Sequence, residues 1–478
     1  MDTRSIHKLR QRGRVNKDMS GVKELQIERK QLFEDVYSGR IPRRVPICAF
    51  LPIEFCIEYT GLPLAETQWT LEGIEEALDN TFQITRSDYC PAGFSRFPAH
   101  LQILGAKVFV MGSSGFIQHP EVTGMEVEDY DDLIANPYDC LLEKILPRLY
   151  PKLDADPITR SQVMAKAFKA FYDYAEAYER INARMVDKYG FYLPPAGSTG
   201  VAIAPFDFLA DFLRGFKGIL MDVKRIPERI VEACEAVLPL QIKKGMPQKP
   251  SKFGQTFIPL HMAPYLRPAD FEKLYWPTLF KMVNIFSRAG QPCRLFCEQD
   301  WMRYLDYLYE LPENTRLCFE YGDPRIVKEK LGKKHIISGF YPLTYLKTAT
   351  KQQCIDKAKE LLDILAPGGK YIFEFDKNPV SLDSVNVENY VAVLEYVAEH
   401  ANYTNPGKTI LAEAGTSPSA TSFSTPLELE IPTFKSKYYK LWEAGEERVV
   451  VDSPLESIIA KKMQGYEEQL FKMLLTLV

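Results

Sequence analysis

Polar and ionisable residues close five short apolar segments in the second half of the chain. In chain order these ends are His261, Cys297 with Glu298, Glu320, Gly339, and Glu374 with Asp376. If the segments are parallel strands of one sheet, their carboxyl ends meet at one opening and bring these side chains together. Carboxylates that are buried without partners are unfavourable, so such a cluster indicates a cation, a proton or an arginine between them.

An imidazole combined with carboxylates is also a ligand set that zinc accepts. We therefore expect His261, Glu298 and Glu320 to hold a metal ion, with zinc as the expected cofactor. Each position also has an ordinary structural explanation. A histidine or cysteine here could belong to the core, and Glu298 could pair with Arg294 or Arg303. The later carboxylates could be solvated at the rim of the opening.

Strand-like apolar segments alternate with helix-like segments from about residue 256 to residue 400. The five strands are expected at residues 256–261, 293–298, 316–320, 335–339 and 370–374. Strands that alternate with helices pair in parallel through right-handed crossovers. Three earlier candidates, at residues 46–50, 86–90 and 191–204, complete a set of eight. The sequence therefore predicts an α/β fold of the (β/α)8 TIM-barrel type. An open doubly wound sheet is the alternative, although no strand runs into the G-x-G-x-x-G fingerprint that often accompanies it.

The barrel is expected to span residues 41–403, with an extension at each end. Residues 1–40 predict an N-terminal arm followed by a helix, since Val22, Leu25 and Leu32 recur at roughly helical spacing. Residues 404–478 predict a C-terminal linker rich in Thr, Ser and Pro, then an amphipathic helix that packs on the barrel. A dimerisation element is the alternative for that helix, and a homodimer would follow from it.

Composition excludes several classes of protein. The 478 residues carry 59 basic and 63 acidic side chains and a net charge of −4, which argues against a nucleic-acid partner. No apolar stretch reaches the roughly 18 residues that a membrane helix needs, and the polar N-terminal segment is not a secretory signal. We therefore expect a cytoplasmic protein without a membrane partner. Nine scattered cysteines without a C-x-x-C pair do not form a disulfide framework.

Longer motifs follow one another along roughly residues 25–400. They include Arg44-Val-Pro-Ile, Gln118-His-Pro-Glu-Val, Glu128-Asp-Tyr-Asp-Asp-Leu-Ile, Phe206-Asp-Phe-Leu, Phe271-Glu-Lys-Leu-Tyr-Trp-Pro277 and Pro367-Gly-Gly-Lys-Tyr-Ile-Phe. In this pattern the chain resembles the uroporphyrinogen decarboxylase superfamily. The resemblance implies a (β/α)8 barrel, in agreement with the strand count.

The superfamily contains decarboxylases and corrinoid-dependent methyltransferases. The decarboxylases carry an R-Q-A-G-R-Y segment after the first strand, which grips the carboxylates of the tetrapyrrole. Here the corresponding stretch, Phe50-Leu-Pro-Ile-Glu-Phe-Cys-Ile-Glu-Tyr59, has two glutamates and no arginine. The chain therefore looks more like the methyltransferase branch, in which zinc lies near the barrel mouth and a separate corrinoid protein docks there. It departs from that branch's usual H-x-C zinc motif, because the fifth strand offers Phe296-Cys297-Glu298.

The resemblance implies methyl transfer from a small methylated substrate, such as a methoxyaromatic compound, to cob(I)alamin on a partner corrinoid protein. The metal would act as a Lewis acid on the leaving oxygen, and Glu374 or Asp376 would donate a proton. Aromatic residues near the strand ends would line an apolar substrate pocket: Phe50, Tyr89, Tyr321 and Phe340.

Two other functions remain open. The first is decarboxylation of a smaller carboxylated substrate, using Asp88, which matches the region where the decarboxylases place an essential aspartate. The second is a barrel that binds a corrinoid or porphyrinoid protein without catalysis. Release of carbon dioxide, formation of methylcobalamin, or binding without turnover would separate the three.

Overall fold

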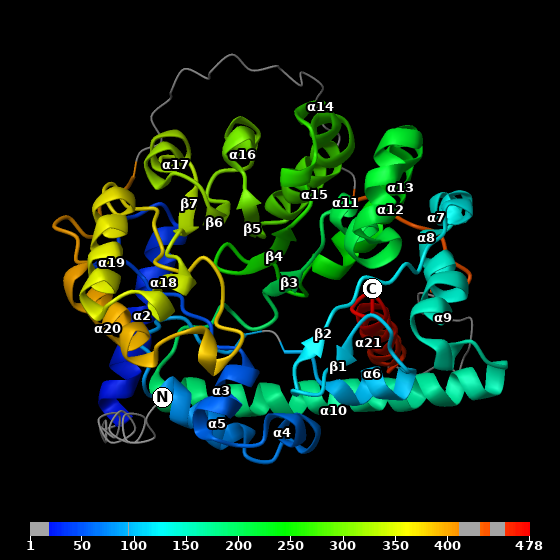
Figure 1. Cartoon of the computed structure of the whole chain (residues 1–478), viewed down its shortest axis with the longest axis horizontal. Coiled ribbons are helices and arrows are strands. Elements are labelled where there is room, and N and C mark those ends of the chain that lie inside the picture. The colour runs from blue at the N-terminus through cyan, green and yellow to red at the C-terminus, as the bar shows by residue number, and fades with distance from the viewer. Residues whose placement is uncertain (1–18, 94, 411–430, 440–454) are drawn as a thin grey trace.

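The computed structural model describes residues 19–93, 95–410, 431–439 and 455–478. Its centre is a parallel sheet of five strands in the order β3-β4-β5-β6-β7 (Figure 1). The strands are β3 (Thr199–Val201), β4 (Gln255–Leu260), β5 (Cys293–Asp300), β6 (Arg316–Tyr321) and β7 (Ile336–Gly339). A separate antiparallel pair joins β1 (Val110–Met111) to β2 (Ile117–Gln118). The fold is therefore mixed α/β, and the four longer strands of the sheet lie where the sequence placed them.

Helices connect these strands and cover the outer face of the sheet. Those of the first half are α2 (Met19–Tyr37), α3 (Ile53–Thr60), α4 (Leu64–Thr70), α5 (Ile74–Phe82), α6 (Pro98–Leu104), α7 (Tyr130–Ala135), α8 (Pro137–Cys140), α9 (Leu146–Leu149) and α10 (Pro157–Tyr189). Those of the second half are α11 (Pro205–Asp207), α12 (Gly215–Arg225), α13 (Pro227–Gly245), α14 (Pro268–Asp270), α15 (Trp276–Arg288), α16 (Leu305–Glu310), α17 (Pro324–Leu331), α18 (Leu343–Thr348), α19 (Lys351–Leu365), α20 (Val387–His400) and α21 (Glu456–Leu474). In Figure 1, α15, α16 and α17 lie outside the strands, while α10 runs along the opposite side of the molecule.

The candidate at residues 191–204 contains β3, whereas the candidates at 46–50 and 86–90 and the segment 370–374 form isolated parallel bridges instead of regular strands. The bridged pairs are Ile47 with Phe373, Leu51 with Ala92, Tyr89 with Tyr192, Ile337 with Tyr371, and Tyr341 with Phe375. The regular sheet thus has five strands where eight were expected, and a full (β/α)8 barrel is not present as continuous sheet. Prolines explain part of the difference, because Pro46, Pro52, Pro91 and Pro194 cannot donate a ladder hydrogen bond.

Burial along β5 alternates with a period of two residues. Cys293, Leu295 and Cys297 are fully buried among the helices, whereas Arg294 and Phe296 keep part of their surface exposed. Successive side chains of a strand point to opposite faces, so one face of β5 packs on helices and the other faces inward. The sequence did not separate these two faces, because apolar residues occupy both.

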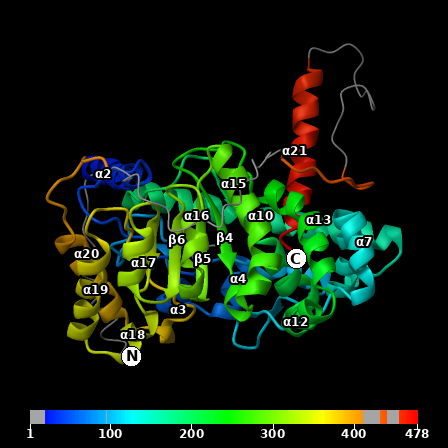
Figure 2. The same ribbon diagram turned by 90° about the horizontal axis from the view of Figure 1, so that it is seen from above.

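The C-terminal helix α21 is anchored at its end and projects at its beginning (Figure 2). Phe471 is fully buried and stacks on Tyr138, with ring centroids 5.4 Å apart. The Tyr150 hydroxyl donates to the carbonyl of Leu477 at 2.6 Å. The end of the helix therefore packs on the body of the molecule. The expected N-terminal arm and most of the linker, at residues 1–18, 411–430 and 440–454, lie outside the described residues.

Two sequence-based exclusions can be compared with the structure. All nine cysteines are free and buried, which confirms that they do not form a disulfide framework. Within the described ranges, no helix is long and apolar enough to cross a membrane.

Candidate functional site

The inward-facing residues of β4 and β5 point to the interior of the curved sheet. Arg294 of β5 reaches across to Glu374 near the last bridged segment, and its guanidinium lies 5.1 Å from the ring centroid of Phe50 near the first. These contacts span several strands, so the side chain must point to the interior. Four neighbours on the same face keep part of their surface exposed: Phe50, Phe257, Pro259 and Phe296. We call Arg294 and these four residues the inner cluster.

His261 lies directly after β4, at the carboxyl end of that strand. Its Nδ1 is 2.8 Å from Oδ1 of Asp211, which belongs to the π-helical segment η4 (Phe208–Arg214). The backbone around His261 is held by Asp207, whose carboxylate accepts from the N–H groups of His261 and Met262 and from the hydroxyl of Tyr275. π-Helical turns occur frequently at functional sites. Here the end of α11 places Asp207 against the backbone of His261, and the π-helical segment that follows places Asp211 against its ring.

The pairing with Asp211 makes His261 a proton carrier. The hydrogen bond from Asp211 raises the pKa of His261 to about 9, against the opposing effect of partial burial, with smaller contributions from Glu298 and Asp207. The imidazole is therefore protonated at neutral pH. Its Nε2, the ring nitrogen not engaged by Asp211, is the one that can face a substrate, with Tyr265 edge-on at 6.0 Å.

Glu298 and Glu320 are close enough to His261 to influence it, but they have different surroundings. Glu298 makes no hydrogen bond or ion pair with the described residues, and burial raises its pKa. Glu320 is bonded to Nζ of Lys377 at 2.6 Å and to the backbone N–H of Gln299 at 2.8 Å. Gln299 has a positive φ of 59° at a register shift in β5, and this irregularity directs its N–H at Glu320.

The predicted metal ligands are brought to the same end of the sheet but are not arranged around a common point. Among the residues that the structure describes, no group of three or more His, Cys, Asp or Glu side chains is placed to hold a metal ion. His261 is committed to Asp211 and Glu320 to Lys377. This donor arrangement does not fit a zinc site, and elemental analysis of the purified protein tests the zinc that the sequence led us to expect.

Glu374 is held by two arginines inside the sheet. One carboxylate oxygen is bonded to Arg294 and the other to Nη2 of Arg316, the latter at 2.6 Å. Burial alone would raise the pKa of Glu374, but the two guanidiniums hold it below its usual value. The arrangement therefore does not favour Glu374 as a proton donor.

Asp376 is better suited to donate a proton. Burial raises its pKa to about 6, although one oxygen accepts from the backbone N–H of Leu343 at 2.8 Å. It also interacts electrostatically with Glu320 and Lys377, so it lies on the same side of the opening as those residues. Its catalytic role stays a prediction.

Asp88 lies at the beginning of its bridged segment, not at the end where the sequence suggested it. Arg44 grips its carboxylate with two nitrogens, each at 2.7 Å, and Nε of Arg29 is 3.3 Å away. The backbone N–H of Ile47 donates a further hydrogen bond at 2.8 Å. A carboxylate with all these partners is typical of a structural ion-pair network, and this placement does not favour a catalytic role.

The four predicted pocket aromatics do not form one wall. Phe50 belongs to the inner cluster and contacts Tyr89 edge-on at 5.5 Å. Tyr89 itself is buried, and its hydroxyl accepts from Gln255 at 3.3 Å. Phe340 stacks on Phe319 at 5.2 Å, whereas Tyr321 is 66% exposed. Phe50 is thus the member of this set that lies beside Arg294.

Sequence reasoning missed Asp207, Asp211 and His119. The two aspartates are four residues apart, the spacing that places side chains on one face of a helix, and that spacing could have indicated them. His119 stacks on Phe109 at 4.6 Å, and burial lowers its pKa. It also feels the charge of His261, so it belongs to the surroundings of the same opening.

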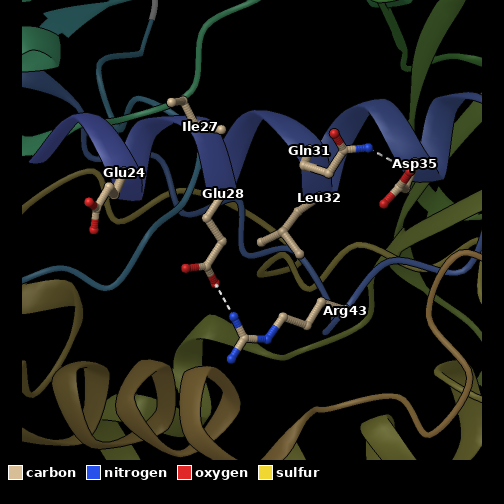
Figure 3. A pocket seen from close by; sticks show the side chains of 7 residues that line it. All are labelled: Glu24, Ile27, Glu28, Gln31, Leu32, Asp35 and Arg43. Atoms are coloured by element: carbon tan, nitrogen blue, oxygen red, sulfur yellow. Dashed lines mark hydrogen bonds and ion pairs between the residues drawn. The ribbon is translucent and has the colours of Figure 1, made fainter. Parts of the chain in front are cut away.

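A pocket of about 380 Å³ lies elsewhere, along helix α2 (Figure 3). Its lining residues are Glu24, Ile27, Glu28, Gln31, Leu32, Asp35 and Arg43. Figure 3 shows the ion pair between Arg43 and Glu28 closing one side of it. None of the predicted site residues lines this pocket.

Comparisons with known proteins support the fold. No family model matches the chain, and no curated protein matches it in sequence. Among solved structures, a methyltransferase from Methanosarcina mazei is similar, with a TM-score of 0.52 and 15% sequence identity. The similarity covers 78% of this chain and 98% of that one. At this identity the likeness establishes a shared fold, and the activity of the neighbour belongs to the proposal below.

Proposed function

We propose that the chain is a methyltransferase that takes a methyl group from an oxygen-linked substrate and delivers it to cob(I)alamin on a separate corrinoid protein. The observation that carries the proposal is the pairing of His261 with Asp211 at the carboxyl end of β4, which raises the pKa of His261. The fold shared with a methyltransferase supports the reaction class. The resemblance to the corrinoid-dependent branch supports the choice of acceptor.

The proposal includes the closure of the sheet. We infer that the five strands and the three bridged segments form one ring of eight parallel segments, because the bridges link β7 to residue 371 and residue 373 to residue 47. In such a ring the carboxyl ends of the segments share one mouth, which is where active sites of this architecture lie. His261, Glu298 and Glu320 all follow that rule.

The residues of this chain would act on the leaving oxygen. An alkoxide or phenoxide is a poor leaving group unless its developing charge meets a cation or a proton. The imidazolium of His261 would donate that proton as the carbon–oxygen bond breaks, and Asp211 would hold the ring and stabilise its charge. In this proposal the proton of His261 neutralises the charge on the leaving oxygen, the role that we expected of zinc from the sequence. Cobalamin, carried by its own protein, would supply the nucleophile that accepts the methyl group.

The test uses purified protein, cob(I)alamin and methoxyaromatic compounds whose phenol products differ in acidity. His261→Gln should slow the formation of methylcobalamin by about 10²–10⁴-fold when the leaving phenoxide is strongly basic. The loss should shrink when a nitro group makes the phenoxide a good leaving group, because protonation then matters less. The rate of the unchanged protein should fall as the pH rises through about 9, where His261 loses its proton.

His400→Gln is the matched control, because His400 is an exposed histidine on α20 whose ring bonds its own helix. It should leave the rates unchanged. Equal rates for His261→Gln and the unchanged protein with every leaving group would refute the assignment of the proton donor. Release of carbon dioxide without methyl transfer would instead support a decarboxylase.

A further inference from the structure

We infer that Asp207 and Tyr275 are positioning residues for His261. Together they fix the backbone that carries the imidazole, so that the ring meets Asp211 in one orientation. Neither residue would touch the substrate, and both would act through His261. The inference rests on the proposed function for the identity of the proton transfer. Three observations carry it: the donors around Asp207, the helical segment that holds both aspartates, and the support of Tyr275.

The first observation is the set of hydrogen bonds that converge on Asp207. Its Oδ2 accepts from the backbone N–H of His261 at 3.1 Å and from the hydroxyl of Tyr275 at 2.6 Å. Its Oδ1 accepts from the backbone N–H of Met262 at 2.9 Å. Strand β4 ends at Leu260, so both N–H groups have left the sheet and depend on this carboxylate for a partner. Asp207 therefore fixes the direction of the chain at His261.

A carboxylate is the side chain suited to this position. It accepts from all three donors, whereas the amide of asparagine has a donor in place of one of the two oxygens. No lysine or arginine of the described residues forms an ion pair with Asp207, so its three hydrogen bonds must offset the cost of burying it. Asp207 and Tyr275 are each 1% exposed, so water cannot replace either partner.

The second observation is that one helical segment carries both aspartates. Asp207 is the last residue of α11, and Asp211 lies four positions later in the π-helical segment η4. A π-helical turn is wider than an α-helical turn, so residues four positions apart lie almost in line along its axis. The segment therefore contacts His261 at two points, the backbone N–H and the ring Nδ1. These two contacts together set the direction in which Nε2 points.

The third observation is that Tyr275 is itself held in place. It is the last residue of η6 (Phe271–Tyr275), which packs against α11 and continues into α15. Its ring lies against Phe206, the neighbour of Asp207 in the chain, with ring centroids 5.7 Å apart. Tyr275 thus ties the position of Asp207 to α15. A misplacement of about 1 Å at a reacting group can slow a reaction by about 10²-fold, so this support should affect the rate.

The test compares two buried tyrosines of the same aromatic cluster. Tyr275→Phe removes the hydroxyl that bonds Asp207. Tyr304→Phe is the matched control, because Tyr304 is fully buried, stacks on Phe271, and donates its hydroxyl to the carbonyl of Leu266 at 2.9 Å. Each variant loses one buried hydrogen bond, so both should lose thermal stability to a similar extent. Only Tyr275→Phe should affect the proton donor.

The first readout is methyl transfer from the methoxyaromatic compounds to cob(I)alamin. Tyr275→Phe should lower kcat by about 10-fold when the leaving phenoxide is strongly basic, and should leave KM unchanged. The loss should shrink with the nitro-substituted compound, as for His261→Gln, because protonation then matters less. Tyr304→Phe should match the unchanged protein with both compounds. A purely structural role would lower the Tm of both variants without changing the dependence on the leaving group.

The second readout does not depend on turnover. NMR relaxation of protein labelled in its histidines gives the order parameter of the His261 ring, with the signal assigned from its loss in His261→Gln. We expect a value near the roughly 0.85 of a rigid group in the unchanged protein and in Tyr304→Phe. In Tyr275→Phe the value should move toward the roughly 0.6 of a flexible group. If Tyr275→Phe does not fold, Asp207→Asn is measured in its place.

The inference would be overturned by a Tyr275→Phe protein that has the same ring order and the same leaving-group dependence as Tyr304→Phe. The proposed function fails separately. A ring that loosens only in Tyr275→Phe, in a protein without any methyl transfer, would uphold the positioning role and refute the function. Unchanged rates in Tyr275→Phe, beside lost activity in His261→Gln, would do the reverse.

Discussion

Replacing Asp211 by asparagine should release the proton that His261 carries. In the structure the pair joins Nδ1 of His261 to Oδ1 of Asp211 at 2.8 Å, and this contact is the largest cause of the raised pKa. Loss of one adjacent opposite charge lowers a histidine pKa by roughly 1–2 units. We therefore expect the pKa of His261 to fall from about 9 toward its usual value of 6.5 in Asp211→Asn. Glu298 and Asp207, which also face the ring, would retain part of the shift.

Asp211→Asn should also lower the free energy of unfolding, and it should do so in a defined pH range. A shift from 6.5 to about 9 corresponds to roughly 3 kcal/mol before screening. The His261 side chain is 38% exposed, so screening by solvent reduces this to about 1 kcal/mol. Because the folded-state pKa is the raised one, this contribution is complete below about pH 6.5. It declines between pH 6.5 and 9 and is absent above pH 9.

Two measurements check these values. NMR titration of the six histidine rings, with the His261 signal assigned from its loss in His261→Gln, gives the pKa directly. Urea unfolding at pH 6 and pH 10 gives the stability difference. Asp270→Asn is the control, because Asp270 pairs with the exposed Arg267, three residues before it, and not with a histidine. A His261 pKa that moved by less than half a unit in Asp211→Asn would refute the reasoning.

Three further predictions follow from other parts of the molecule. Asp88→Asn should destabilise the fold by about 3–5 kcal/mol, because it leaves Arg29 and Arg44 without their counterion. Unfolding in urea measures this loss. Lost turnover at unchanged stability would instead indicate a catalytic aspartate. Phe471→Ala should cost about 3–5 kcal/mol by emptying the site where α21 packs on Tyr138, and thermal unfolding would measure it. Elemental analysis of protein purified without added metal should find less than one zinc per chain, and one tightly held zinc that is lost in His261→Gln would contradict the arrangement described above.

The sequence was most informative where one strand follows another through a single helix. Strands β4 to β7 fell at the predicted segments because each is a short apolar run followed by a helix with its own start and stop signals, such as the Asp323 side chain that accepts from the backbone N–H of Arg325. The earlier segments were harder to predict, because prolines leave them with isolated bridges. Ile47 bridges Phe373 and Tyr89 bridges Tyr192, so their extended conformation depends on residues far along the chain, which local patterns do not encode.

The candidate site was predicted in part. His261, Glu298 and Glu320 do lie at one end of the sheet and interact electrostatically, as the strand ends suggested. Their partners could not be predicted, since the pairing of Arg294 with Glu374 joins residues 80 positions apart. Asp211 was hidden within an apolar helical stretch. A pattern of residue types indicates which side chains lie near the opening of the sheet. It does not indicate which cation or carboxylate each side chain pairs with.

The two faces of β5 can accept substitutions independently of each other, with different consequences for the protein. Substitutions at Leu295 and Cys297 alter how the strand packs against its helices. Substitutions at Phe296 and Glu298 change the side chains that face the interior of the sheet. A saturation screen along this strand should therefore read out folding and selectivity at alternate positions. Single substitutions on the inward-facing side of β5 could therefore change the substrate preference without altering how the strand packs on its helices.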